Sequence, residues 1–272
     1  MKTLRRIATV VAVIYAMLVA ALYVGQRRFL YPVPLVLVPQ LAGGSLIRAE
    51  TRDGQPVVVL YVPAQAGQMT VVHFHGNGDQ LATTTFIGSA LAARGLGFFG
   101  VEYPGYGLAS NGTTTEQNVY AVADAALAYL HDQLHVPASQ IVLQGHSLGS
   151  GVAAEMATRG HGARLVLLAP YTSMTDVASR LMPAFPAHWL LRDRYDTLGK
   201  TARLTLPVLV LCGSLDKLVP PAMSRTLAAA LPNVQVLEDG GAGHNDLFDS
   251  AGYAACVLAF ARGERCAPED RR

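Results

Sequence analysis

QIVLQGHSLGSGVAAEMATR, residues 140–159, is the stretch that decides the fold of this chain. It opens with β-formers at 141–143, turns sharply through GHSLG at 145–149, and continues as a helix of small residues. A serine between two glycines at such a turn is a nucleophile elbow, because the tight backbone excludes flanking side chains and pushes the hydroxyl above the sheet edge. The alternative is a serine in an ordinary turn. The flanking strand and helix favour the first interpretation, so we predict that Ser147 is a nucleophile.

The composition is that of a folded chain with a substantial core. Of its 272 residues, 51% are hydrophobic and 15% are charged, and the net charge is +2. The sequence has no dense basic block and no aromatic residues interleaved with basic ones, so nothing indicates a nucleic-acid partner. The cysteines form neither a CxxC pair nor a zinc spacing. We interpret Cys212 as a small buried hydrophobe; Cys256 and Cys266 are close enough to be bridged in an oxidising compartment, a question that the sequence leaves open.

The N-terminus carries a long apolar segment. Residues 7–24 contain no charge, and as a helix they would span ~27 Å, close to the hydrocarbon thickness of a bilayer. Basic residues flank the segment on both sides: Lys2, Arg5 and Arg6 before it, Arg27 and Arg28 after it. We expect residues 1–28 to form an uncleaved transmembrane anchor, and the alternative is a signal peptide cleaved after residues 19–21. The early positive charges favour a folded domain on the non-cytoplasmic side, although Arg27 and Arg28 weaken that inference; the alternative is secretion after cleavage.

The rest of the chain predicts an α/β domain. A proline-rich apolar linker, 29–45, follows the anchor, and two β runs at 46–50 and 57–62 form an antiparallel pair. Apolar strands then alternate with helices, which predicts a mostly parallel central sheet with helices on both faces over residues 46–263. The predicted strands are 70–74, 97–102, 140–143, 165–168, 208–211 and 234–237. The predicted helices are 81–94, 115–131, 148–159, 222–231 and 247–262, and a flexible tail follows at 264–272.

The first parallel strand ends in two histidines at alternate positions, His73 and His75. They point the same way, so a metal site has to be weighed. An HxHxDH metal signature would need Asp in place of Asn77 and His in place of Gly78, and neither is present. The preferred interpretation is that this loop presents the backbone N–H of Asn77 to an oxyanion, opposite the N–H of Leu148 at the start of the helix after the elbow. His73 is then a hydrogen-bonded core residue.

An acid and a base are expected in loops after later strands, because these loops open on the same side of a parallel sheet. Asp216 follows the strand 208–211, and His244 follows the strand 234–237. In this arrangement Asp216 orients the imidazole of His244, which takes the proton from Ser147. Asp246 and Asp249 compete for the acid role, but Asp246 suits the N-cap of the last helix better.

Five motifs in register carry a family resemblance. HGNG at 75–78, YPGYG at 103–107, GHSLG at 145–149, GSLDKLVP at 213–220 and GAGHND at 241–246 resemble the α/β-hydrolase superfamily, serine-hydrolase branch. They are most similar to its single-pass membrane-anchored members, a group that includes protein depalmitoylases and many bacterial hydrolases. The resemblance covers residues 46–262. It implies the α/β-hydrolase fold, a triad of Ser147, Asp216 and His244, and an oxyanion hole at Asn77 and Leu148.

The resemblance also implies a cap inserted after the sixth strand, at 171–205. Its candidate substrate-binding residues are Tyr171, Phe185 and Trp189, which would line an acyl pocket; the alternative is a short helical connection packed on the core. We expect a serine hydrolase that cleaves carboxylic esters or thioesters through an acyl-enzyme, including lipid-like acyl substrates near a membrane, with no metal or organic cofactor. The alternatives are a serine peptidase or amidase, and a non-catalytic membrane-anchored binding protein.

Overall fold

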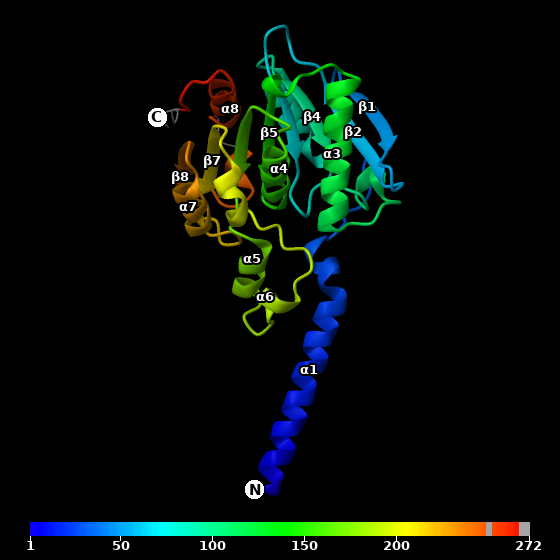
Figure 1. Cartoon of the computed structure of the whole chain (residues 1–272), viewed down its shortest axis with the longest axis vertical. Helices are drawn as coiled ribbons and strands as arrows, with labels where there is room; N and C mark the ends of the chain where they lie inside the picture. The colour runs from blue at the N-terminus through cyan, green and yellow to red at the C-terminus, as the bar shows by residue number, and fades with distance from the viewer. Residues whose placement is uncertain (249–251, 267–272) are drawn as a thin grey trace.

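The computed structural model describes residues 1–248 and 252–266, and its centre is an eight-stranded sheet in the order β1-β2-β4-β3-β5-β6-β7-β8 (Figure 1). The first strand pairs antiparallel with β2 and β2 pairs antiparallel with β4, while every other pairing is parallel. The predicted mostly parallel sheet with an antiparallel start is confirmed. The strands are β1 Ser45–Glu50, β2 Pro56–Val62, β3 Thr70–Phe74, β4 Gly97–Val101, β5 Ile141–His146, β6 Arg164–Leu168, β7 Val208–Gly213 and β8 Val234–Asp239.

Helices cover both faces of the sheet. The α-helices are α1 Lys2–Leu30, α2 Thr85–Ala92, α3 Glu116–Asp132, α4 Leu148–Thr158, α5 Met174–Leu181, α6 Ala187–Leu190, α7 Pro221–Ala230 and α8 Tyr253–Ala261. Helices α3 and α4 belong to one core layer, and α2 and α8 belong to the other. Successive strand residues alternate between the layers: Val72 packs in the first and Val71 in the second. Because both faces are covered, the central strands read as unbroken apolar runs.

Two predicted helices differ from the structure. The predicted helix 81–94 is divided into a 3₁₀ turn, η1 Leu81–Thr84, and α2. The Thr83 and Thr84 hydroxyls each bond to a backbone carbonyl three residues back, which favours a tighter turn at this point. The last helix begins at Tyr253 with Gly252 as its N-cap, so the prediction that Asp246 caps this helix is wrong. Asp246 instead opens a separate 3₁₀ turn, η5 Asp246–Phe248.

The first helix, α1, extends away from the body of the molecule (Figure 1). It has 29 residues, and its most apolar window has a mean hydropathy of 2.5 and is unburied. Among the described residues it is the one helix long and apolar enough to cross a membrane. Its last turns pack beside α5 and α6, where Val19 and Leu22 contact a small apolar cluster that includes Phe185. The helix ends two residues beyond the predicted boundary at 28.

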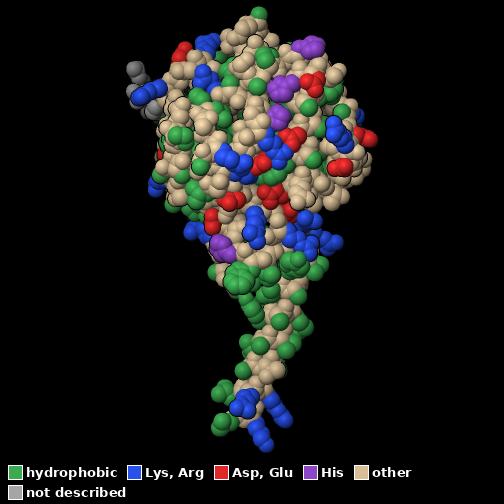
Figure 2. All heavy atoms as spheres, viewed as in Figure 1, with side chains coloured by type: hydrophobic (Ala, Val, Ile, Leu, Met, Phe, Trp, Pro, Cys, Tyr) green, Lys and Arg blue, Asp and Glu red, His purple; other side chains and the backbone are tan. Residues whose placement is uncertain are grey.

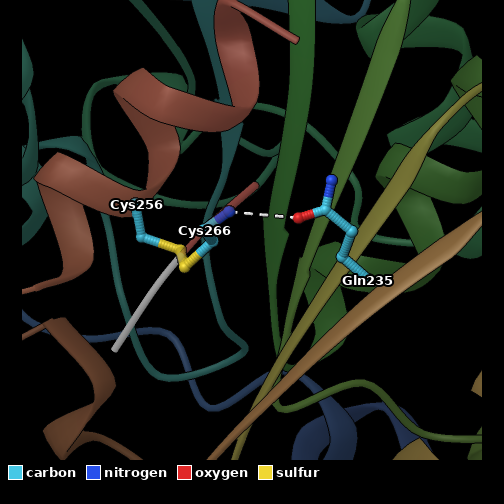
Figure 3. The surroundings of a disulfide bond; sticks show 3 residues. All are labelled: Gln235, Cys256 and Cys266. Carbon is cyan, nitrogen blue, oxygen red and sulfur yellow. Dashed lines mark hydrogen bonds between the residues drawn. A yellow bond between two sulfur atoms is a disulfide. The ribbon is translucent and has the colours of Figure 1, made fainter. Parts of the chain in front are cut away.

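A disulfide closes the C-terminal region. Cys256 on α8 is bonded to Cys266, and the backbone N–H of Cys266 donates to Gln235 Oε1 of β8 at 3.1 Å (Figure 3). Residues 264–266 of the predicted flexible tail are therefore attached to the sheet, while residues 267–272 lie outside the described residues. Cys212 is free and buried, as predicted.

The disulfide makes a stability prediction possible. The bond closes a loop of sequence separation 10, so Cys266→Ser should lower the free energy of unfolding by about 2–3 kcal/mol through a less constrained unfolded state. Thermal unfolding of the detergent-solubilised protein measures this change. Dithiothreitol should bring the wild-type midpoint down to that of the variant and leave the variant unchanged. Equal midpoints for the oxidised wild type and the variant would contradict the prediction.

Candidate active site

Ser147 occupies the turn between β5 and α4 in a backbone conformation that side chains rarely adopt. Its φ is 51° and its ψ is −117°. A methyl group on Gly145 would collide with the carbonyl of Gly149, and one on Gly149 would collide with the carbonyl of Phe74. Both flanking positions therefore require glycine, as the elbow motif predicts. Strain of this kind persists where the surrounding structure fixes it, and it holds the Ser147 hydroxyl at the sheet edge.

Ser147, His244 and Asp216 form one hydrogen-bonded chain, although 97 residues separate the first two. His244 Nε2 lies 2.9 Å from Ser147 Oγ, and His244 Nδ1 lies 2.7 Å from Asp216 Oδ2. This geometry fits a neutral imidazole whose Nδ1–H donates to the carboxylate and whose Nε2 accepts from the hydroxyl. The structure thus brings together the three side chains predicted from the sequence.

The Asp216 carboxylate is fixed on its other side by the backbone. Its Oδ1 accepts from the N–H groups of Leu218 at 2.9 Å and Val219 at 2.8 Å, and the residue is buried. These bonds leave Oδ2 free to hold the imidazole. The alternative acid, Asp246, uses its Oδ2 to accept from the N–H of Gly243 at 2.9 Å. Asp249 lies outside the described residues.

The HGNG loop after β3 is held beside Ser147 by two buried tyrosines. Tyr103 donates to the carbonyl of His75 at 2.7 Å, and Tyr106 donates to the carbonyl of Asn77 at 2.8 Å. Asn77 lines the same cavity as Ser147 and Leu148. The Leu148 amide is the first of α4, so it has no acceptor one turn earlier in the helix. Asn77 and Leu148 are therefore both placed at the cavity where an oxyanion would form.

His73, in β3, and His75, just after it, have separate partners. His73 Nδ1 accepts from Gln144 Nε2 at 3.0 Å, and burial lowers the pKa of His73 to about 3, which keeps the ring neutral. His75 lies between Glu102 Oε1, at 3.1 Å from its Nε2, and the carbonyl of Gly76. Over the described residues, no group of three or more His, Cys, Asp or Glu side chains is arranged to hold a metal ion.

Two residues of the site escaped the sequence reasoning, His146 and Asp79. His146 Nε2 donates to the backbone carbonyl of His244 at 3.1 Å, and its Nδ1 faces Asp79 Oδ2 at 3.9 Å. Burial alone would raise the pKa of Asp79, but the neighbouring His146 and other imidazoles lower it to about 2. His146 therefore positions the loop that carries His244. The histidine inside GHSLG and the aspartate just after HGNG were the available signals.

An apolar cavity of about 280 Å³ opens beside Ser147. Tyr171 and Phe185 line it, whereas Trp189 is 85% exposed and does not. Tyr171 also donates to the carbonyl of Leu148 at 3.1 Å, which ties the start of the predicted cap, 171–205, to the elbow. Four residues of α1 belong to the wall as well, a contribution that the sequence reasoning missed. The apolar lining residues are Leu22, Phe29, Leu30, Leu148, Met174, Val177, Ala178, Leu181, Met182, Phe185, Leu191, Leu218 and Val219.

Comparison with known proteins gives consistent matches. Residues 65–199 match the family described as serine aminopeptidase, S33, and residues 184–251 match the family described as alpha/beta hydrolase fold. An uncharacterized protein of Mycobacterium tuberculosis is 32% identical over 248 residues, which is 88% of each chain. Mouse alpha/beta hydrolase domain-containing protein 17C is 30% identical over 201 residues, 72% of this chain and 61% of that protein. A Pyrococcus furiosus esterase structure has a TM-score of 0.69 at 15% identity, covering 85% of this chain and 99% of that chain, which shows the fold alone.

The hydrogen bond between Asp216 and His244 can be tested by a single change. Asp216→Asn should lower the turnover number for a chromogenic short-chain ester by roughly 10³–10⁴-fold, because the amide no longer fixes the required tautomer of His244. Asp246→Asn is the matched control, since its amide oxygen can still accept from Gly243, and it should keep most of the activity. Near-normal turnover in Asp216→Asn, with a loss in Asp246→Asn, would transfer the acid role to Asp246.

Proposed function

Because this chain belongs to the α/β-hydrolase family, we propose that it is a serine hydrolase that cleaves carboxylic esters or thioesters through an acyl-enzyme. The observation that carries the proposal is the continuous hydrogen-bonded chain from Asp216 through His244 to Ser147, which ends at an apolar cavity. In this proposal Ser147 is the nucleophile, His244 is the general base, and Asp216 holds the charged imidazole.

The proposed reaction has two halves. Ser147 Oγ attacks the acyl carbon while His244 Nε2 takes the hydroxyl proton, and the carbonyl oxygen becomes an anion near the amides of Asn77 and Leu148. Collapse of this intermediate breaks the bond to the leaving alcohol or thiol, which receives the proton from His244. Water then repeats the same steps on the acyl-enzyme, releasing the carboxylic acid and restoring Ser147.

Amide cleavage is the second candidate reaction, because one of the two matching families is described as serine aminopeptidase. An aminopeptidase has to bind the charged amino group of its substrate, and buried charges need a partner. Among the described residues that line the cavity, none is charged; the polar ones are Gln26, Asn77, Ser147 and Tyr171. Such a wall suits an alkyl chain better than an ammonium group, so we favour ester or thioester substrates of an apolar acyl group.

We further propose that α1 anchors the enzyme in a membrane, with the hydrolase domain on the non-cytoplasmic side. The unburied apolar surface of α1 supports the anchor, and the disulfide between Cys256 and Cys266 supports an oxidising compartment. The alternative is a cleaved signal segment. We propose that the chain is divided into an anchor at 1–28, a linker at 29–45, a hydrolase domain at 46–263 with its cap at 171–205, and a tail at 264–272.

Nucleophilic catalysis by Ser147 predicts two linked results. The wild-type protein should hydrolyse p-nitrophenyl butyrate and should be labelled by a fluorophosphonate probe, and Ser147→Ala should abolish both while the melting temperature stays close to that of the wild type. The activity assay and in-gel fluorescence measure these outcomes. Butyrate hydrolysis that persists in Ser147→Ala, or wild-type protein that neither reacts with the probe nor turns over the ester, would end the proposal.

If α1 is a membrane anchor, its removal should release the protein from the membrane fraction. Deleting residues 1–25 should move the protein from the membrane pellet to the supernatant after ultracentrifugation, because the deletion removes nearly all of the apolar span. N-terminal sequencing of native full-length protein provides the control. A mature N-terminus near Ala21 or Leu22 would identify a cleaved signal instead.

A further inference from the structure

One face of α1 is part of the cavity beside Ser147. Leu22, Gln26, Phe29 and Leu30 line this cavity together with Ser147 itself. Their spacing of four, seven and eight residues places them on a single face of the helix. Val24 lies on another face and is 79% exposed. The same helix that is apolar enough to span a bilayer therefore forms a wall of the candidate active site.

Polar contacts fix this face of α1 against the cap. Gln26 is buried; its Nε2 donates to the carbonyl of Leu190 at 3.3 Å, and its Oε1 accepts from the N–H of Arg192 at 2.8 Å. Arg27 Nε lies 2.8 Å from Asp193 Oδ2. These bonds join residues about 165 positions apart in the chain, since their separations are 164 and 166. The wall formed by α1 is thus attached to the cap by its own side chains.

The cavity extends from Ser147 along the axis of α1. Leu30 is at the end near Ser147, because its carbonyl accepts from Asn77 Nδ2 at 3.3 Å. Leu22 lies eight residues earlier, which places it ~12 Å further along the helix axis. An alkyl chain in the cavity would therefore run roughly parallel to α1. Lipid chains in a bilayer lie alongside a membrane-spanning helix in the same orientation.

The tip of the cap, residues 181–189, which we call the cap tip, lies beside the apolar part of α1. The uncharged span between Arg6 and Arg27 is long enough as a helix, ~30 Å, to cross the hydrocarbon core. Tyr15 of α1 donates its hydroxyl to the carbonyl of Ala184, at the cap tip, at 2.8 Å. Figure 2 shows hydrophobic side chains continuing from the helix onto the lower part of the body, with basic side chains next to them.

Exposed apolar side chains belong to this cap tip. Leu181 is 52% exposed and Trp189 is 85% exposed. Exposed apolar groups beside a membrane-spanning helix fit contact with lipid, and tryptophan is enriched at the boundary between lipid and water. Arg192 packs over the Tyr23 ring at 4.3 Å, so a basic side chain lies next to the cap tip on the side toward the body of the molecule.

We propose that the cap tip rests at the lipid–water boundary of the leaflet that contains the C-terminal half of α1, and that the acyl chain of a bilayer-resident ester or thioester enters the cavity along the face formed by Leu22, Phe29 and Leu30. This inference rests on the proposed function. It makes α1 a determinant of acyl-chain specificity as well as a tether. The cavity volume is about 280 Å³, and a group the size of a water molecule takes about 30 Å³. The cavity therefore holds roughly nine chain groups of that size, which suits an acyl chain of medium length.

The test compares Leu22→Trp, which fills the far end of the cavity, with Val24→Trp, which adds the same side chain on an exposed face. Full-length proteins in phosphatidylcholine nanodiscs are assayed with p-nitrophenyl butyrate and p-nitrophenyl decanoate. Leu22→Trp should lower the ratio of decanoate to butyrate kcat/KM by about tenfold or more, the loss expected when two or more methylenes lose their apolar contacts. Val24→Trp should leave the ratio unchanged. Equal ratios in the two variants would overturn the proposal.

A binding measurement separates this proposal from the proposed catalysis. In the Ser147→Ala background, decanoic acid should raise the melting temperature of the Val24→Trp protein more than that of the Leu22→Trp protein. If this difference appears but no ester is cleaved by the wild type, the binding site stands and the hydrolase function fails. If esters are cleaved but neither the ratio nor the melting temperature depends on position 22, the hydrolase function stands and the role of α1 is refuted.

Two further substrates distinguish the sources of the acyl chain. Monodecanoylglycerol and an S-decanoyl peptide, each presented in the same nanodiscs, differ in leaving group and share the acyl chain. If one or both are cleaved, and Leu22→Trp cleaves them more slowly than Val24→Trp does, the proposal is supported. The substrate that is cleaved then shows whether the acyl chain comes from a glyceride or from an acylated protein. Equal rates in the two variants for every substrate that is cleaved would contradict it.

Discussion

The close approach of α4 to the ends of β3 and β5 is the constraint on which the rest of the site depends. Gly149, in the first turn of α4, lies against the carbonyls of Phe74 and His75, and Gly145 lies against the carbonyl of Gly149. These close backbone contacts therefore force the strained turn at Ser147 and fix its distance from the HGNG loop. The candidate nucleophile and the candidate oxyanion donors are positioned by these contacts, because Gly145 and Gly149 of the GxSxG turn lack a side chain.

The same edge of the sheet collects the other two groups. Strands β5, β6, β7 and β8 are successive parallel neighbours, so the loops that follow them open on one side. Asp216 and His244 follow β7 and β8 and meet Ser147 there, and His146 links the elbow to the His244 loop through the His244 carbonyl. The sheet order thus converts a sequence order of Ser, Asp and His into a short hydrogen-bonded chain.

Features fixed by local sequence could be predicted, and features fixed by distant contacts could not. The strand Thr70–Phe74 and the elbow follow from runs of apolar residues and glycine spacing, which act over a few positions. The exposure of Trp189 depends on how the cap folds back onto α1, a contact between segments about 165 residues apart. Gln26 ends an apolar segment and gave no sign in the sequence that its amide would join two parts of the fold. The N-cap prediction for Asp246 is wrong because α8 begins at Tyr253, six residues after the predicted start at 247, and helix boundaries are the feature that single-sequence signals locate least well.

The attachment of α1 to the body explains how a helix outside the core can belong to the site. Asp193, which is buried, accepts from Arg27 and from the backbone N–H of Glu116 at the start of α3. The N-terminus of a helix favours a carboxylate, and the guanidinium supplies the opposite charge, so this buried acid is satisfied on both sides. Glu116 in turn accepts from the N–H groups of Arg194 and Tyr195, which follow Asp193 in the chain. The N-terminal end of α3 therefore holds residues 193–195 of the cap directly, and it holds the C-terminal end of α1 through Asp193. Helix α3 packs in the same core layer as α4, the helix that follows Ser147. The same layer of helices therefore positions both the α1 wall of the cavity and the serine that faces it.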